Sequence, residues 1–86
     1  MLFRSYEQAL AIRREVLGEH HPTTAASLNN LAGLLESQGD YAGARPYYEQ
    51  ALAIMQSALG PTHPKTKTVR ENLAHLNSLI QRRGQT

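Results

Sequence analysis

Apolar residues recur at intervals of three and four positions along most of the chain, which is the spacing of one face of an α-helix. The pattern predicts four helices, at residues 2–17, 22–38, 41–59 and 64–82. The strongest apolar stripe, in the last of these ranges, consists of Val69, Leu73, Leu76 and Ile80. Because no segment alternates strictly between apolar and polar residues, as a half-buried strand would, we expect an all-α fold. The connections are short, so neighbouring helices should be antiparallel.

Residues that favour helix ends and helix starts stand between these ranges. Glycine follows each of the first three predicted helices, at Gly18, Gly39 and Gly60. His21 and His63 each precede a proline, and proline suits the first position of a helix because the amide it lacks would have no partner there. We interpret both histidines as capping residues. Asp40 is expected to cap the third helix.

Pro46 is the residue that conflicts with this pattern, because it lies inside the predicted helix 41–59. A proline in a helix interior costs about 3 kcal/mol through a lost backbone hydrogen bond and a steric clash. With Asp40 as the cap, Pro46 falls in the second turn, and the carbonyl that loses its partner belongs to Ala42. A slight kink at Pro46 and a later start of the helix are both open.

The segment YEQALAI occurs twice, at residues 6–12 and again at residues 48–54, which is 42 positions later. The same offset relates further matches: Leu17-Gly18 with Leu59-Gly60, His21-Pro22 with His63-Pro64, Thr24 with Thr66, Asn30-Leu31-Ala32 with Asn72-Leu73-Ala74, and Leu34 with Leu76. A shared spacing over so many positions indicates one structural unit used again.

The stretch between the two copies resembles the tetratricopeptide repeat, in which one pair of antiparallel helices packs against the next. The large and small positions of the family's first helix are matched by Leu28, Leu31, Ala32 and Leu35. The turn is matched by Gly39-Asp40-Tyr41, and the small, aromatic and small positions of the second helix by Ala44, Tyr48 and Ala51. The usual unit has about 34 residues. The longer period here is similar to the kinesin-light-chain type, which is also found in C-terminal arrays of bacterial signalling ATPases of the NACHT and NB-ARC kind.

This resemblance implies a solenoid of helix hairpins that presents a short groove to a peptide or partner protein. The family's groove positions correspond here to Asn29, Gly33, Glu36 and Ser37 on one helix and to Glu71, His75, Ser78 and Leu79 on another. Asn29 is either a contact for a peptide backbone or a solvent-exposed polar residue. The recurrence of Asn30 as Asn72 indicates a hydrogen bond between helices that fixes their packing.

The chain is expected to be a fragment of a longer repeat array, in which the last helix is a C-terminal cap. Arg70 and Asn77 stand where the preceding unit has Leu28 and Leu35, so an apolar face has become polar. The end of a solenoid must present such a polar face to water. The alternative function is therefore a capping and self-association segment with no ligand of its own.

Self-association is expected to involve the first predicted helix. Its apolar residues Phe3, Tyr6 and Leu10 would normally pack against a preceding helix, and a second copy of the chain is the expected cover. Exchange of helices through a straightened Gly39-Asp40 turn is the less favoured route to a dimer.

Composition and charge narrow the function classes. The net charge of the 86 residues is +2, and basic residues gather toward the end of the chain at Lys65, Lys67, Arg70, Arg82 and Arg83. We interpret them as a solvated helix face rather than a nucleic-acid surface, because no aromatic residue lies among them to stack on bases. The chain has no cysteine, no apolar run as long as a membrane span and no secretory signal pattern. A cytoplasmic location is expected, with neither a membrane nor a nucleic acid as partner.

No arrangement of residues indicates catalysis, a metal or a cofactor. The histidine positions include no pair spaced for one helical face, and two of the four are interpreted as caps. Glu7 and Glu49 are equivalent positions of the repeat and far apart along it, so the sequence gives no reason to expect them to form a catalytic pair. No serine lies in a nucleophile elbow, and no glycine-rich phosphate loop is present. A non-enzymatic interaction module is the leading hypothesis.

Overall fold

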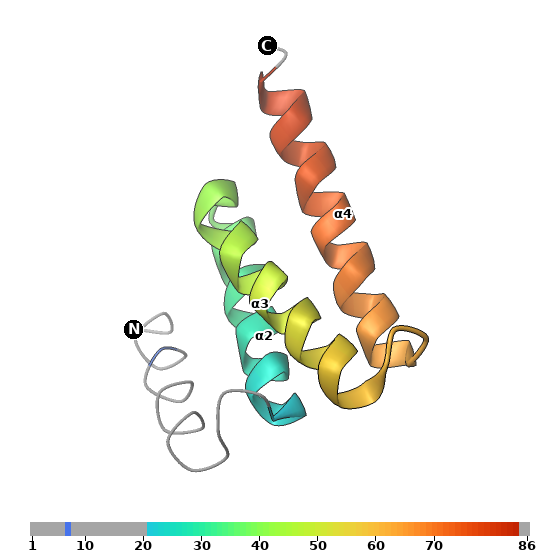
Figure 1. Ribbon diagram of the computed structural model, residues 1–86. Helices are drawn as coiled ribbons and strands as arrows, with labels where there is room; N and C mark the ends of the chain where they lie inside the picture. Colours follow the sequence, from blue (N-terminus) through green and yellow to red (C-terminus); the bar gives the residue numbers. More distant parts are fainter. Residues whose placement is uncertain (1–6, 8–20, 85–86) are drawn as a thin grey trace.

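The computed structural model describes Glu7 and residues 21–84. Three helices follow one another in this part of the chain: α2 (Pro22–Ser37), α3 (Tyr41–Leu59) and α4 (Pro64–Gly84) (Figure 1). Between residues 21 and 84 there is no strand, in agreement with an all-helical solenoid. The expected count of four helices is not matched, because the range 2–17 lies outside the described residues except for Glu7, which is helical and exposed.

The observed helix ends lie close to the expected ones. Helix α2 ends at Ser37 rather than residue 38, α3 has the expected range, and α4 continues to Gly84 rather than residue 82. The self-association residues Phe3, Tyr6 and Leu10 lie outside the described residues, so the structure leaves that prediction as it stands.

The two histidines that precede proline are helix caps, as interpreted from the sequence. The amide of Thr23 donates a hydrogen bond to Nδ1 of His21 at 3.0 Å. The amide of Lys65 donates in the same way to Nδ1 of His63 at 3.1 Å. Each imidazole thus accepts from one of the first amides of its helix, which have no partner inside the helix itself. Histidine therefore recurs at this position of the repeat because it caps the following helix in both units.

A tight turn joins α2 to α3. The amide of Asp40 donates to the carbonyl of Leu35 and the amide of Gly39 to that of Glu36, both at 2.9 Å, which is the bond pair of a Schellman motif. Gly39 has a φ of 84°, a conformation that glycine adopts without steric cost. The carboxylate of Asp40 then caps α3 by accepting from the amide of Gly43 at 2.9 Å. One residue therefore closes one helix and opens the next.

Helix α3 runs without a break through Pro46. The helix begins at Tyr41, so the later start that the proline left open is not found. Pro46 and Ala42 are both exposed. The proline ring thus points away from the core, and the carbonyl that has lost its amide partner belongs to an exposed residue. This position limits the cost of the missing hydrogen bond.

Helix α3 packs against both α2 and α4, and the contacts use very small side chains. Ala25 and Ala32 of α2 and Ala44 and Ala51 of α3 are all 0% exposed. Small residues let helix backbones approach closely, and larger residues fill the space around them. The larger buried residues are Leu28, Leu31 and Leu35 of α2, Tyr48, Ile54 and Met55 of α3, and Val69 and Leu76 of α4.

A matched pair of substitutions tests this packing. Replacing Ala51, which is 0% exposed, by leucine should destabilise the fold by about 1–3 kcal/mol, because the added atoms have no space between the helices. Ala53 lies two residues further along the same helix and is exposed. Ala53→Leu should change the free energy of unfolding by no more than about 0.5 kcal/mol. Urea unfolding followed by circular dichroism measures both, and equal effects would contradict the packing described here.

Candidate functional site

A groove of about 300 Å³ opens between the first halves of α2 and α4. Its lining consists of Pro22, Thr23, Ala26, Asn29 and Asn30 from α2, Met55 from α3, and Lys65, Thr68 and Val69 from α4. Met55 and Val69 are buried, at 3% and 2% exposure, and supply an apolar base. We call this feature the α2–α4 groove. Its volume lies at the lower end of the range for ligand sites, so it has room for one or two side chains of a partner.

A hydrogen bond joins the two helices that flank the α2–α4 groove. Nδ2 of Asn72 on α4 donates to Oδ1 of Asn29 on α2 at 3.1 Å. The sequence predicted an inter-helix bond from Asn30 and Asn72, and Asn72 does make one, but its partner is Asn29. Asn30 is exposed at the groove instead. Since the carbonyl oxygen of Asn29 accepts from Asn72, the NH₂ group of Asn29 is the part suited to a peptide carbonyl.

Two of the other groove positions predicted on α2, Gly33 and Glu36, lie close to the hydroxyl of Tyr48. This hydroxyl donates to Oε1 of Glu36 at 3.2 Å. A methyl group at position 33 would lie 3.7 Å from the same oxygen, so Gly33 leaves only a shallow space there. Burial raises the pKa of Tyr48 to about 12, and the negative charge of Glu36 and its hydrogen bond act in the same direction. Glu36 is thus hydrogen-bonded to Tyr48, a core residue of α3 that packs between the two helices of the hairpin.

The remaining predicted groove positions do not line the α2–α4 groove. The hydroxyl of Ser37 donates to the carbonyl of Leu34 at 2.8 Å, and that of Ser78 to the carbonyl of Ala74 at 3.2 Å. Glu71 and His75 are exposed on α4. Among the predicted positions, only Asn29 is part of the groove lining. The structure therefore brings one predicted residue to this site together with others that the sequence analysis missed.

Two matches to the family model described as "Tetratricopeptide repeat" cover residues 3–57 and 24–85, which together span nearly the whole chain. The chain belongs to the tetratricopeptide repeat family. Such repeats generally mediate interactions between proteins, and the family is generally not enzymatic. The alternation of α2, α3 and α4 is the arrangement of one tetratricopeptide repeat followed by the first helix of the next.

Two curated relatives share part of the chain. Both are named "Tetratricopeptide repeat protein 19, mitochondrial", one from Rattus norvegicus and one from Mus musculus. Each is 43% identical over 44 residues, which is 51% of this chain and 12% of the relative. The chain thus spans only about an eighth of the length of these relatives, and the similarity concerns the tetratricopeptide repeat rather than a whole protein.

The 42-residue period of this tetratricopeptide repeat explains which residues were missed. Thr23 and Lys65 are equivalent positions of successive units, as are Ala26 and Thr68, and all four line the α2–α4 groove. Thr23, Ala26 and Asn29 are spaced by three residues and therefore share one face of α2. This spacing is the sequence signal that extends the predicted face toward the start of the helix.

The described residues contain no group of three histidine, cysteine or acidic side chains that could hold a metal ion. None of the helices between residues 21 and 84 is long and apolar enough to cross a membrane.

The Tyr48–Glu36 contact generates a prediction about alkaline pH. The folded chain keeps the Tyr48 proton up to about pH 12, whereas the unfolded chain releases it near the ordinary value of 10.0. Stability from this difference is fully present below about pH 10 and is lost as the pH rises toward about 12. Tyr48→Phe should therefore flatten the decline of stability over this range, as measured by urea unfolding at a series of pH values.

Glu36→Gln provides the companion variant, since it keeps an acceptor for the hydroxyl but removes the charge. The pKa of Tyr48, followed by phenolate absorbance, should fall from about 12 but stay above 10.0, because burial is the largest cause of the shift. A decline with pH that is identical in wild type and Tyr48→Phe would contradict this account.

Proposed function

We propose that this chain is a non-enzymatic protein-interaction module that presents the α2–α4 groove to an extended peptide of a partner protein. The observation that carries the proposal is the groove itself, which has an apolar base between two helices of successive repeats. Family membership supports the class of function, because tetratricopeptide repeats generally bind proteins or peptides.

The chemistry of the lining suggests how a peptide would be held. An apolar side chain would rest on Met55 and Val69, while the NH₂ group of Asn29 would donate to a backbone carbonyl. The bond from Asn72 already orients the Asn29 amide, so little ordering of the receptor is needed on binding. With one groove of this size we expect weak binding, and higher affinity when several repeats act together.

Blocking the α2–α4 groove tests this function. Ala26 is exposed and lines the groove, so Ala26→Trp places an indole in it without disturbing the core. Peptides selected from a phage-displayed random library against the immobilised chain should bind Ala26→Trp about tenfold more weakly than wild type. Fluorescence anisotropy of the labelled peptides measures the affinities.

Ala53→Trp is the control, because Ala53 is exposed on α3 and does not line the groove. It should bind the selected peptides as wild type does. If the library yields no specific peptide, or if both tryptophan variants bind equally well, the proposed groove function fails.

A second candidate, a terminal cap with no ligand, is favoured by one observation about α4. Leu28, Ala32 and Leu35 of α2 are buried against the hairpin, with exposures of 5% or less. The positions one repeat later are Arg70, Ala74 and Asn77, and all three are exposed. In addition, Nη2 of Arg70 donates to the carbonyl of Pro61 at 3.0 Å, so its side chain lies along the loop before α4. A polar face here suits the water-exposed end of a solenoid.

Under this second proposal the chain would be part of a longer array of the 42-residue, kinesin-light-chain-like type. The predicted dimer contact at Phe3, Tyr6 and Leu10 would then be the place where another repeat, or a second copy of the chain, is attached.

Restoring the apolar face of α4 tests the capping role. The double substitution Arg70→Leu and Asn77→Leu should cause self-association that increases with concentration. The two exposed leucines would recreate on α4 the apolar stripe that α2 carries at the equivalent positions. Light scattering over a dilution series should show a larger average mass than wild type at each concentration. The substitutions Lys67→Leu and Gln81→Leu add the same apolar groups at other exposed positions of α4 and serve as the control. Equal masses for the two double variants would argue against a specific cap face.

A further inference from the structure

Helix α4 is longer than its counterpart in the preceding repeat. Helix α2 ends at Ser37, which corresponds to position 79 after the 42-residue offset, but α4 continues to Gly84. The equivalents of residues 80–84 are residues 38–42, which form the turn and the start of α3. The last turn of α4 therefore has no helical counterpart in α2, and any site built on it is specific to this part of the chain.

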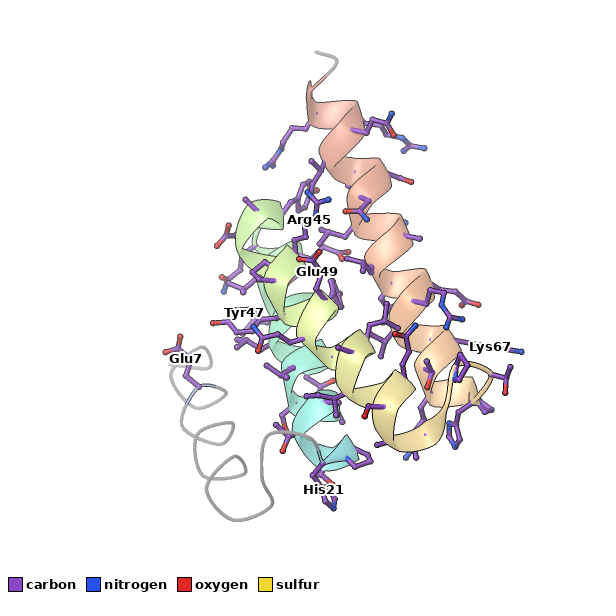
Figure 2. All side chains as sticks on the ribbon, viewed as in Figure 1. Glu7, His21, Arg45, Tyr47, Glu49 and Lys67 are labelled. Atoms are coloured by element: carbon purple, nitrogen blue, oxygen red, sulfur yellow. The ribbon has the colours of Figure 1, made fainter. Side chains whose placement is uncertain are left out.

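This additional turn forms a pocket with the start of α3. The pocket has a volume of about 320 Å³ and is lined by Tyr41, Ala42 and Arg45 from α3 and by Ile80 and Arg83 from α4. We call it the arginine pocket. Figure 2 shows Arg45 near the beginning of α3, on the part of the helix beside α4. The lining contains two guanidinium groups and no carboxylate.

The contacts that hold Arg83 in place include a hydrogen bond and a ring contact. Its Nη1 donates to the carbonyl of Gly39 at 2.9 Å, and its guanidinium carbon lies 4.3 Å from the centroid of the Tyr41 ring. A planar guanidinium fixed in this way loses less conformational freedom when it binds a carboxylate than a mobile one does. The hydrogen bond and the ring contact thus orient one of the two charges of the pocket in advance.

The local electrostatics favour an anion. Arg45 and Arg83 place two positive charges at one pocket, and the pocket adjoins the amino end of α3, where the helix dipole is also positive. Two carboxylates lie near the pocket. That of Asp40 accepts from the amide of Gly43 as the helix cap. Glu49, one turn after Arg45 on α3, is exposed and is not part of the pocket lining (Figure 2). A carboxylate supplied from outside would lie beside both guanidinium groups of the lining and accept hydrogen bonds from them.

We propose that the arginine pocket binds an acidic side chain of a partner protein, held between Arg45 and Arg83, with a neighbouring aliphatic side chain on Ile80 and Ala42. The volume admits one or two side chains, which suits an acidic residue next to an apolar one. A nucleic acid fits less well. The lining has one aromatic ring, Tyr41, and a face of that ring is covered by Arg83 rather than open for stacking on a base.

The arginine pocket is separate from the α2–α4 groove. The two linings share no residue, and on α4 they lie at opposite ends, around Lys65 to Val69 and around Ile80 to Arg83. The inference therefore goes beyond the proposed groove function and stands or fails independently of it. A partner that contacts both sites would have to follow α4 along most of its length.

A peptide of defined composition tests the proposal on the 86-residue chain. The probe is fluorescein-labelled Gly-Ser-Glu-Leu-Glu-Ser-Gly, and the reference peptide has glutamine in place of both glutamates. At about 50 mM salt, wild type should bind the acidic peptide about tenfold more tightly than the reference, and Arg45→Gln should lose this preference. Arg45 is the residue to change, because Arg83 also contributes structural contacts.

Three controls separate a specific site from general charge attraction. Lys67→Gln removes one positive charge at an exposed position of α4 that does not line the pocket, and it should change the affinity less than about twofold. Ala26→Trp, which blocks the groove, should leave binding of the acidic peptide unchanged. Amide chemical-shift changes on adding the peptide should gather at Ala42 and Ile80 rather than at Ala26 and Thr68.

Several results would overturn the proposal. One is equal affinity of wild type and Arg45→Gln for the acidic peptide, or equal losses in Arg45→Gln and Lys67→Gln. Another is displacement of the peptide by a single-stranded oligothymidine that binds more tightly than the peptide does, since that would assign the charges to a nucleic acid. Shift changes confined to the α2–α4 groove would show that the acidic peptide uses the other site.

Discussion

The close approach of α3 to its neighbours is the constraint on which the rest of the structure depends. Ala32, Ala44 and Ala51 are completely buried, and their small side chains let the helix backbones approach closely. This approach brings the ring of Tyr48 across the hairpin, so that its hydroxyl reaches Glu36 on α2. The tight turn at Gly39, with its positive φ, joins the two helices across this short distance.

Helix α3 packs against both α2 and α4, and these two helices, which begin successive repeats, come close enough to each other to share contacts. The bond between Asn29 and Asn72 is one result, and the α2–α4 groove beside it is another. The arginine pocket has a different origin, because it depends on α4 continuing past the point where α2 ends. The repeat therefore produces one surface, and a departure from the repeat produces the other.

The fold and the candidate site were predictable to different degrees. Helix ends follow local rules, and His21, His63 and Asp40 cap their helices as their sequence contexts indicated. The site depends on how helices face one another. Asn29 was identified as a groove position, but its bond to Asn72 was not, because the register between α2 and α4 is set by packing on α3. Exposed residues such as Lys65 have no apolar pattern that would mark them as lining a groove.

The sequence by itself determined the helices, their caps, the hairpin turn and the membership of a repeat family. These features depend on residues close together in the chain, or on a period that is visible without coordinates. Tertiary structure alone decided which side chains line the α2–α4 groove, that Glu36 is engaged by Tyr48, and that Arg45 and Arg83 share a pocket. The physical reason is that helical periodicity sets only the direction of each side chain around its own axis. The distance between side chains on different helices depends on the crossing angle and separation of those helices, which result from the packing of the whole core.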